Sequence, residues 1–334
     1  MNLDQKHNFY GLTAHWAMSA IESLGLKPTG AYFKLNSYEN RVFDLFLEKG
    51  QNPDELNDHI IIKIYRPDRW SKLALIEEQS FLDSLFDAGI PVIKNYSINN
   101  ESVHEHKGLY FALYKKGVGR LPQELNLSNL KSIGRTLALI HNVGENKKSV
   151  HRKTLNTYDY GWPALENLSN WVSPESWNRY CQASEEILNF LDDQINESQF
   201  FRIHGDCHLG NIIMTDSYTA ETSHQPPFFM VDFDDFCMGP AVQDFWMLLS
   251  GPVSESKSEL DNLISGYEEF RHFPDEQINL IEGLRGLRII HYAHWIAKRW
   301  SDPVFPSYFP QFGEYIYWAE ETEMLEKIAW NLNS

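Results

Sequence analysis

The segment HGDCHLGN, residues 204–211, places two histidines, an aspartate, a cysteine and an asparagine within eight positions. The core of a folded domain does not require so many polar groups in one short segment, because buried polar groups cost free energy unless they are hydrogen-bonded. The segment therefore indicates a site that handles a metal ion, a nucleophile or a phosphate group.

The first two of these interpretations have little support elsewhere in the chain. A strand would place His204, Asp206 and His208 on one face, where a transition metal could bind, but the glycines of the segment favour a loop and no further cluster has ligand spacing. Cys207 beside the histidines could form a thiolate, but we find no orienting group or oxyanion site for it. A buried structural cysteine is the simpler interpretation.

Residue spacing favours the phosphate interpretation. Asn211 follows Asp206 by five residues, and a second acidic cluster, VDFDD, occupies residues 231–235. In protein kinases an aspartate and an asparagine at this spacing contact the acceptor hydroxyl and a magnesium ion, and a later aspartate completes the metal site. Magnesium prefers hard oxygen ligands, so Asn211 and Asp232 together with nucleotide phosphates form a suitable set.

A kinase site also needs a lysine on a strand and a glutamate on the adjoining helix. Lys63 interrupts the apolar segment HIIIKIY, residues 59–65, where a charge is costly unless it is paired. Glu78 lies in an apolar helical stripe with Leu75 and Leu82, so the helix should direct it inward. We therefore expect Lys63 and Glu78 to form an ion pair that holds the α- and β-phosphates of ATP.

The hydrophobic pattern divides the chain into a β-rich part and a helical part. Helical spacing marks residues 10–25 and 72–89, and four segments have the β-branched and aromatic composition of strands: 40–47, 59–65, 91–97 and 109–115. Beyond the connector at 115–120 the pattern is typical of long helices: 128–143, 176–193, 241–250, 257–271 and 277–300.

This pattern predicts an α+β, two-lobed protein-kinase-like fold. We assign residues 1–115 to a β-rich N-terminal lobe with the nucleotide-binding sheet and the Glu78 helix. Residues 116–334 form a helical C-terminal lobe with the catalytic loop, the magnesium site and the acceptor region. A cleft between two lobes is a common place for a ligand.

Composition excludes several classes of function. A formal net charge of −17 argues against binding to nucleic acid or to an anionic membrane surface. The three cysteines form no even framework, which fits a reducing compartment. The N-terminus has no signal-peptide pattern, and no segment approaches the roughly 20 apolar residues of a membrane span. We expect a cytoplasmic monomer with no nucleic-acid or membrane partner.

Together these motifs resemble a known family. HGDCHLGN with VDFDD is similar to the aminoglycoside phosphotransferase and choline kinase superfamily, which shares the protein-kinase fold. A wider set resembles the bacterial stress response kinase A family, the YihE-type protein kinases, from about residue 30 to about residue 312. The matching segments are LNSYENRVF (35–43), KIYRPDRW (63–70), EEQSFL (77–82), RIHGDCHLGNI (202–212), GPAVQDFWMLL (239–249) and YEEF (267–270).

The resemblance implies a role for each matching residue. Asp206 is the proton acceptor, Asp232 completes the catalytic centre, and Asn211 and Asp232 bind magnesium. Lys63 binds phosphate, and Ser37 lies near the nucleotide in a loop that replaces a glycine-rich lid.

The resemblance also implies a residue that supports the catalytic loop, Asp244, which matches a buried aspartate of the family. The implied activity is ATP- and magnesium-dependent phosphorylation of serine or threonine, including self-phosphorylation, in a cytoplasmic response to envelope and oxidative stress.

Two departures from the kinase pattern stand in this sequence. The interval from Asn211 to Asp232 is 21 residues, which we attribute to a loop at 215–228. Asp234 follows Phe233 where protein kinases have a glycine, and it is either a second metal ligand or a residue that caps the turn.

Two other functions remain possible. A small-molecule kinase would phosphorylate an amino alcohol, a sugar or an antibiotic, and a pseudokinase scaffold would bind nucleotide without turnover. The helix-like segment at 287–300 places His291, His294 and Lys298 on one face. This face is either a packed amphipathic surface, which is the simpler interpretation, or part of an acceptor site.

Overall fold

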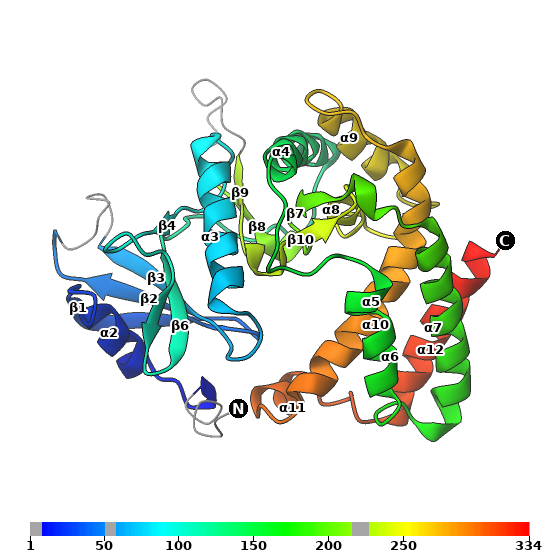
Figure 1. The fold of residues 1–334 in the computed structure, drawn as a ribbon, viewed down its shortest axis with the longest axis horizontal. Helices are drawn as coiled ribbons and strands as arrows, with labels where there is room; N and C mark the ends of the chain where they lie inside the picture. Colours follow the sequence, from blue (N-terminus) through cyan, green and yellow to red (C-terminus); the bar gives the residue numbers. More distant parts are fainter. Residues whose placement is uncertain (1–8, 51–57, 216–226, 334) are drawn as a thin grey trace. The chain divides into compact units, whose positions relative to one another are not determined.

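The computed structural model describes residues 9–50, 58–215 and 227–333. The chain forms two compact units, and the first consists of Met1–Pro122 together with Gly210–Asp234. A β-sheet dominates the first unit and helices dominate the second, as Figure 1 shows, so the predicted α+β class is confirmed. The predicted lobe boundary between residues 115 and 116 stays a prediction.

The first unit is built on a six-stranded antiparallel sheet in the order β1-β2-β3-β6-β4, with β5 paired to β6. Three predicted strands are confirmed, and the one predicted at 91–97 is reduced to two residues. The strands are β1 (Pro28–Leu35), β2 (Arg41–Leu47), β3 (His59–Ile64), β4 (Asn95–Tyr96), β5 (His104–His106) and β6 (Leu109–Tyr114).

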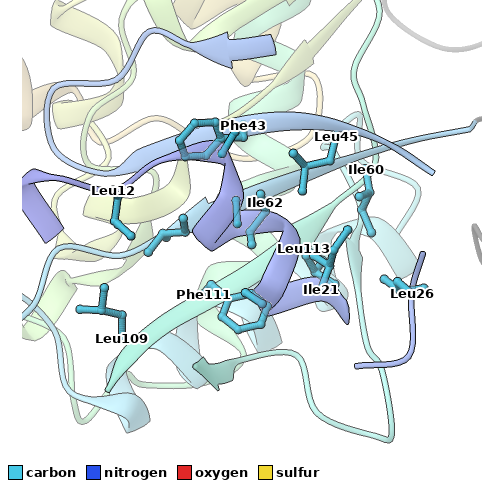
Figure 2. Close-up of a cluster of buried hydrophobic side chains, with 14 of the residues drawn as sticks. Leu12, Ile21, Leu26, Phe43, Leu45, Ile60, Ile62, Leu109, Phe111 and Leu113 are labelled. Atoms are coloured by element: carbon cyan, nitrogen blue, oxygen red, sulfur yellow. The ribbon is translucent and has the colours of Figure 1, made fainter. Parts of the chain in front are cut away.

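One face of this sheet forms a hydrophobic core with helix α2 (Ala14–Glu22). Figure 2 shows Ile21 of this helix near Leu113 and Phe111 of β6. Burial of each large apolar side chain contributes about 1.5–3 kcal/mol. Because side chains alternate along a strand, burial of Ile62 on this face places its neighbour Lys63 on the opposite face.

Helix α3 (Lys72–Asp87) supplies the glutamate predicted to pair with Lys63. Its first turn is capped by Ser71, whose Oγ accepts a hydrogen bond of 3.1 Å from the backbone N–H of Ala74. The predicted stripe is buried along its length, and Glu78 is only 1% exposed. The helix therefore directs this carboxylate into the protein, as its spacing predicts.

The second unit contains the long helices and a short two-stranded sheet of β7 (Phe201–Ile203) and β10 (Cys237–Gly239). Prediction was correct for the long helices but missed the last one and overestimated α8. The helices are α4 (Leu127–Glu145), α5 (Thr157–Tyr160), α6 (Trp162–Leu168), α7 (Pro174–Gln194), α8 (Gln243–Trp246), α9 (Lys257–Tyr267), α10 (Ile281–Arg299), α11 (Val304–Tyr308) and α12 (Tyr315–Leu332).

Helices α4 and α9 approach each other closely at two glycines. A Cβ atom at Gly134 would lie 2.0 Å from the carbonyl oxygen of Leu263, and one at Gly266 would lie 1.9 Å from that of Lys131. A larger side chain at either position would force the helices apart. Among the described helices, none is both long enough and apolar enough to cross a membrane.

Candidate active site

Lys63 of β3 is surrounded by carboxylates in the first unit. Its Nζ lies 2.8 Å from Oδ1 of Asp232, 3.3 Å from Oδ1 of Asp234 and 3.6 Å from Oε1 of Glu78. The structure therefore contains the expected pair of Lys63 with Glu78. Ala112 is the partner of Lys63 on β6, and its small side chain leaves room for the lysine.

The carboxylates keep this buried lysine charged. Burial acts to lower the pKa of Lys63, but the negative charges of Asp232, Asp234 and Glu78 outweigh it and hold the pKa well above its ordinary value. A permanently protonated amine with little solvent around it is suited to contact an anion such as a phosphate.

The two aspartates beside Lys63 have different surroundings. The Asp234 side chain is 3% exposed, and its Oδ2 accepts hydrogen bonds from Nδ2 of Asn40 at 3.1 Å and from the Arg69 guanidinium. The Asp232 side chain is 51% exposed and its backbone has a φ of +61°. Left-handed φ values in non-glycine residues are uncommon and concentrate at functional sites. Asp232 is therefore the more accessible of the two carboxylates, although its Oδ1 already accepts a hydrogen bond from Lys63.

The acidic segment is fixed to helix α3 between these two aspartates. Phe233 is 1% exposed and makes an edge contact with Phe81 of α3, with ring centroids 5.9 Å apart. This contact anchors the segment on α3, and the residues on either side of Phe233 in the sequence, Asp232 and Asp234, both contact Lys63.

Asn211 reaches the same region through a hairpin. Strands β8 (Ile212–Met214) and β9 (Phe228–Met230) pair antiparallel, and the carbonyl of Asn211 accepts a hydrogen bond of 3.0 Å from the N–H of Val231. The two predicted magnesium ligands are therefore close along the hairpin despite their separation in sequence. Most of the 215–228 loop lies outside the described residues.

The oxygen chemistry of this group fits a magnesium ion. Asn211 offers an amide oxygen and Asp232 a carboxylate, both of the hard type that magnesium prefers. Lys63 and Arg69 contribute two positive charges against the three carboxylates of Asp232, Asp234 and Glu78. The excess of negative charge favours a cation at the exposed Asp232 carboxylate.

The loop between β1 and β2 contacts two arginines that the sequence interpretation did not single out, Arg66 and Arg69, and Nε of Arg69 lies 4.0 Å from Oε1 of Glu39. Arg66 forms an ion pair of 2.9 Å with Glu39 and donates to the carbonyl of Tyr38 at 3.2 Å. The Arg66 N–H also donates to Oδ1 of Asn40 at 3.2 Å. The motifs NSYENRV and YRPDRW are thus one connected network.

Ser37 stabilises the turn of this loop. Its Oγ accepts a hydrogen bond of 3.2 Å from the backbone N–H of Asn40. Asn40, Arg66 and Arg69 lie in motifs that match the family, so the sequence did mark these segments. It did not indicate their contacts, because the contacts join residues far apart in the chain.

The segment that carries Asp206 belongs to the second unit and is braced by Asp244. The Asp244 side chain is 0% exposed, and its two oxygens accept backbone hydrogen bonds of 2.8 Å from His204 and Gly205. His141 donates from Nε2 to Asp244 at 3.0 Å and accepts from the Tyr267 hydroxyl at 2.8 Å. These contacts match the bracing role implied for Asp244.

Gly205, in the same loop, occupies a position that other residue types do not fit. Its φ is +83°, and a Cβ atom there would lie 2.4 Å from the carbonyl oxygen of Asp235. Only glycine combines this conformation with this close approach.

Asp206 is held by cationic or hydrogen-bonding side chains. Arg288 of α10 donates from its guanidinium to Oδ1 at 2.7 Å, and His208 lies 3.4 Å from Oδ2. Burial acts to raise the pKa of Asp206, but the hydrogen bond from His208 and the charge of Arg288 outweigh it and hold the pKa below its usual range. The carboxylate is therefore ionised and can accept a hydrogen bond from a hydroxyl group. Sequence reasoning missed Arg288, which lies 82 residues away along the chain.

The competing chemistries have no support in this segment. Cys207 is fully buried, and burial together with Asp244 and Asp206 raises the pKa of its thiol well above the ordinary value, so it does not form a thiolate readily. Across residues 9–50, 58–215 and 227–333, no group of three His, Cys, Asp or Glu side chains is arranged to hold a metal ion. The transition-metal interpretation is therefore not supported.

Comparison with known proteins places this geometry in context. Residues 35–278 match the model of the phosphotransferase enzyme family. Stress response kinase A of Escherichia coli (strain K12) is 34% identical over 308 residues, which cover 91% of this chain and 89% of that protein. Serine/threonine protein kinase RdoA of Salmonella typhimurium (strain LT2) is 31% identical over 322 residues, which cover 96% and 93%.

A solved structure shares the fold. Amicoumacin kinase, in complex with AMP-PNP, Ca²⁺ and Ami, superposes with a TM-score of 0.72 at 17% identity, covering 94% of this chain and 93% of the other.

Proposed function

The chain belongs to the phosphotransferase enzyme family, and from this membership we propose that it is an ATP- and magnesium-dependent kinase that phosphorylates serine and threonine in proteins, itself included. The observation that carries the proposal is the arrangement of Lys63 among Glu78, Asp232 and Asp234. Phosphoryl transfer needs positioned charges around the phosphates, and this arrangement supplies them.

Each unit contributes different groups to the reaction. In the first, Lys63 contacts the nucleotide phosphates, and Glu78 fixes the lysine in place. Asn211 and Asp232 would hold Mg²⁺, which when bound neutralises charge on the phosphates. Asp234 is already engaged by Asn40 and Arg69, so we assign it to positioning.

The loop at 36–40 is suited to cover the nucleotide. This loop is not glycine-rich. Its conformation is fixed by the hydrogen bonds of Arg66 to the loop backbone and by the hydrogen bond that Ser37 accepts from Asn40. A loop held in one geometry lowers the entropy lost when a phosphate binds.

Asp206 orients the acceptor hydroxyl and accepts its proton during transfer. The ionised state that Arg288 and His208 enforce fits this role, because a protonated carboxyl could not accept the proton. Two matches to kinases named for stress response and for serine and threonine support the choice of a protein acceptor. A cytoplasmic monomer that acts in stress response remains our expectation.

A small-molecule kinase is the second candidate, and one specific observation favours it. The chain shares its fold with amicoumacin kinase, whose name gives a small molecule as substrate. Fold alone does not determine the acceptor, because all these acceptors present a hydroxyl group.

One experiment separates the two candidates. Purified protein with labelled ATP and Mg²⁺ is offered a generic protein substrate in one series and a panel of amino alcohols, sugars and antibiotics in another. We expect label on serine or threonine of polypeptide, including the chain itself, and none with Asp206→Asn. Phosphorylation of one small alcohol orders of magnitude faster than any polypeptide would overturn the protein-kinase assignment.

A further inference from the structure

A cavity of about 410 Å³ lies in the second unit between α5, α6 and α10. The Lys63 group belongs to the other unit, so none of its residues lines this cavity. Basic and aromatic side chains form much of its lining: Lys153, Tyr160, Trp171, His291, His294 and Lys298. Three of them are the residues that sequence spacing places on one face of α10.

The two histidines that line this cavity have different hydrogen-bond surroundings. His291 lies 3.2 Å through Nδ1 from the carbonyl oxygen of Tyr160. Because a carbonyl can only accept, Nδ1 carries the proton. The Nδ1 atom of His294 is buried and has no hydrogen-bond partner among the described residues. This atom is enclosed by protein, so the histidines form the wall of the cavity and the positive charge at the cavity comes from its lysines.

The charge around the cavity is positive, in contrast to the chain as a whole. Lys153 and Lys298 are exposed at the edge of the cavity. Nζ of Lys153 donates to the backbone carbonyl of Asp159 at 3.2 Å and lies 4.9 Å from the centre of the Tyr160 ring, while the carboxylate of Asp159 accepts from the backbone N–H of Thr154 at 3.0 Å. Two lysines against one carboxylate leave a local excess of positive charge in a chain whose formal net charge is −17. Such a site attracts an anion and repels a cation.

The pKa values of the histidines reflect this local field. Burial and the charge of Lys153 lower the pKa of His291 to about 3, and burial and the charge of Lys298 lower that of His294 to about 4. Both rings are neutral at physiological pH, and an anion in the cavity would offset the charges that disfavour their protonation.

The cavity is connected to the catalytic segment along two routes. Helix α10 carries Arg288, which contacts Asp206, and with a rise of about 1.5 Å per residue His291 follows about 5 Å and Lys298 about 15 Å further along the axis. The carbonyl of Lys153 accepts a hydrogen bond of 3.1 Å from Met238 of β10, the partner strand of β7. β7 leads directly into the Asp206 segment.

We propose that this cavity binds an acidic group, a carboxylate or a phosphate, on the polypeptide acceptor, a few residues from the serine or threonine that is phosphorylated. The proposal rests on the proposed function and names its substrate class. An extended chain spans about 3.3–3.6 Å per residue, so the helix distances correspond to an acidic residue about two to four positions from the acceptor. Tyr160 and Trp171 would contact the apolar part of that side chain.

The test compares matched peptides that contain one serine. The series carries alanine, glutamate, phosphoserine or lysine at positions two to four from that serine, and kcat/KM is measured for each. We expect kcat/KM to be roughly tenfold higher for the glutamate peptide than for the alanine peptide, which corresponds to one hydrogen bond to a charged group. A further gain with phosphoserine would identify phosphate as the preferred anion, and equal values for the two would identify carboxylate.

Variants assign the preference to the cavity. Lys153→Met with Lys298→Met should remove the preference for the acidic peptides without changing the rate on the alanine peptide. Lys327→Met, at an exposed lysine of α12, is the matched control and should keep the preference. Equal rates on acidic and neutral peptides in the wild type, or a preference that persists in the double variant, would overturn the proposal.

A binding measurement separates this proposal from the proposed function. The acidic peptide with alanine in place of serine is titrated into the full-length protein by calorimetry, and the His291 and His294 resonances are followed by NMR. Binding that shifts these resonances and is lost in the double variant supports the cavity even if no peptide is phosphorylated. Absence of binding overturns it even if neutral proteins are good substrates.

Discussion

Replacing Asp244 by asparagine changes one atom in a side chain that is 0% exposed. The carboxylate accepts hydrogen bonds from the backbone of His204, from the backbone of Gly205 and from the ring of His141. An asparagine has one accepting oxygen, so whichever way its amide is turned, an NH₂ group faces at least one N–H of the protein.

The structure sets the size of the effect. Hydrogen bonds to charged groups contribute about 1.5–3 kcal/mol each, and an unsatisfied buried donor costs about 1–3 kcal/mol. We therefore expect Asp244→Asn to lower the free energy of unfolding by about 3 kcal/mol. The Asp206 segment should also move, and a displacement of about 1 Å at a catalytic group can lower the rate about 100-fold.

Two measurements test this expectation. Urea unfolding followed by tryptophan fluorescence gives the loss of stability, and steady-state kinetics separates kcat from the KM for ATP. We expect kcat to fall and the KM for ATP to stay nearly constant, because Lys63, which we propose binds the phosphates, lies in the other unit. Asp261→Asn, at an exposed aspartate of α9, is the control and should change stability by less than about 0.5 kcal/mol. If Asp244→Asn behaves like this control in both assays, Asp244 does not brace the catalytic segment.

Asp206→Asn should abolish phosphoryl transfer and leave nucleotide affinity near normal, because the carboxylate serves the acceptor; nucleotide titration and turnover assays check both, and undiminished turnover would remove Asp206 from its role. Asp232→Ala should remove the magnesium dependence of ATP binding, measured as thermal stabilisation by ATP with and without Mg²⁺; an unchanged dependence would place the ligand elsewhere. Lys63→Ala and Glu78→Ala should lose less activity together than the sum of the single losses, whereas strict additivity in a double-mutant cycle would contradict the ion pair. Burial raises the pKa of Glu321 to about 7 despite the hydrogen bond of 2.5 Å that its carboxylate accepts from the Tyr317 hydroxyl. Between about pH 4.5 and 7 the folded state therefore keeps a proton on Glu321 that the unfolded state has lost. The free energy of unfolding should fall by about 3 kcal/mol as pH rises through this window. Urea unfolding at several pH values measures this fall, which Glu321→Gln should not show.

Local periodicity explains why the first unit was largely predictable. The apolar stripe around Glu78 lies within helix α3, and the apolar residues around Lys63 lie within strand β3. Each pattern can be read from one continuous segment, so both side chains were assigned to the correct faces. Strand β1 was missed because seven of its eight residues are exposed, which leaves no alternation for the sequence to show.

Long-range contacts account for the remainder of the site. The arginine network joins the residue 36–40 loop to Arg66 and Arg69, and Arg288 reaches Asp206 from a distant helix. A single sequence carries no periodic signal for such pairs, since their proximity depends on how whole elements pack. Motif resemblance identified the segments concerned but did not indicate which side chains touch.

The composition of the first unit from two separate chain segments has a consequence for synthesis on the ribosome. Strands β1 to β6 leave the exit tunnel before residues Gly210–Asp234, which complete the unit. N-terminal segments generally begin to fold first during synthesis. Throughout the translation of residues 123–209, the nascent sheet has Lys63 but neither Asp232 nor Asp234, and an amine buried without those partners is unfavourable. During that interval Glu78 is the only one of the three carboxylates that can balance the charge of Lys63, so the charge pattern around the lysine is completed only when the chain has been made as far as Asp234.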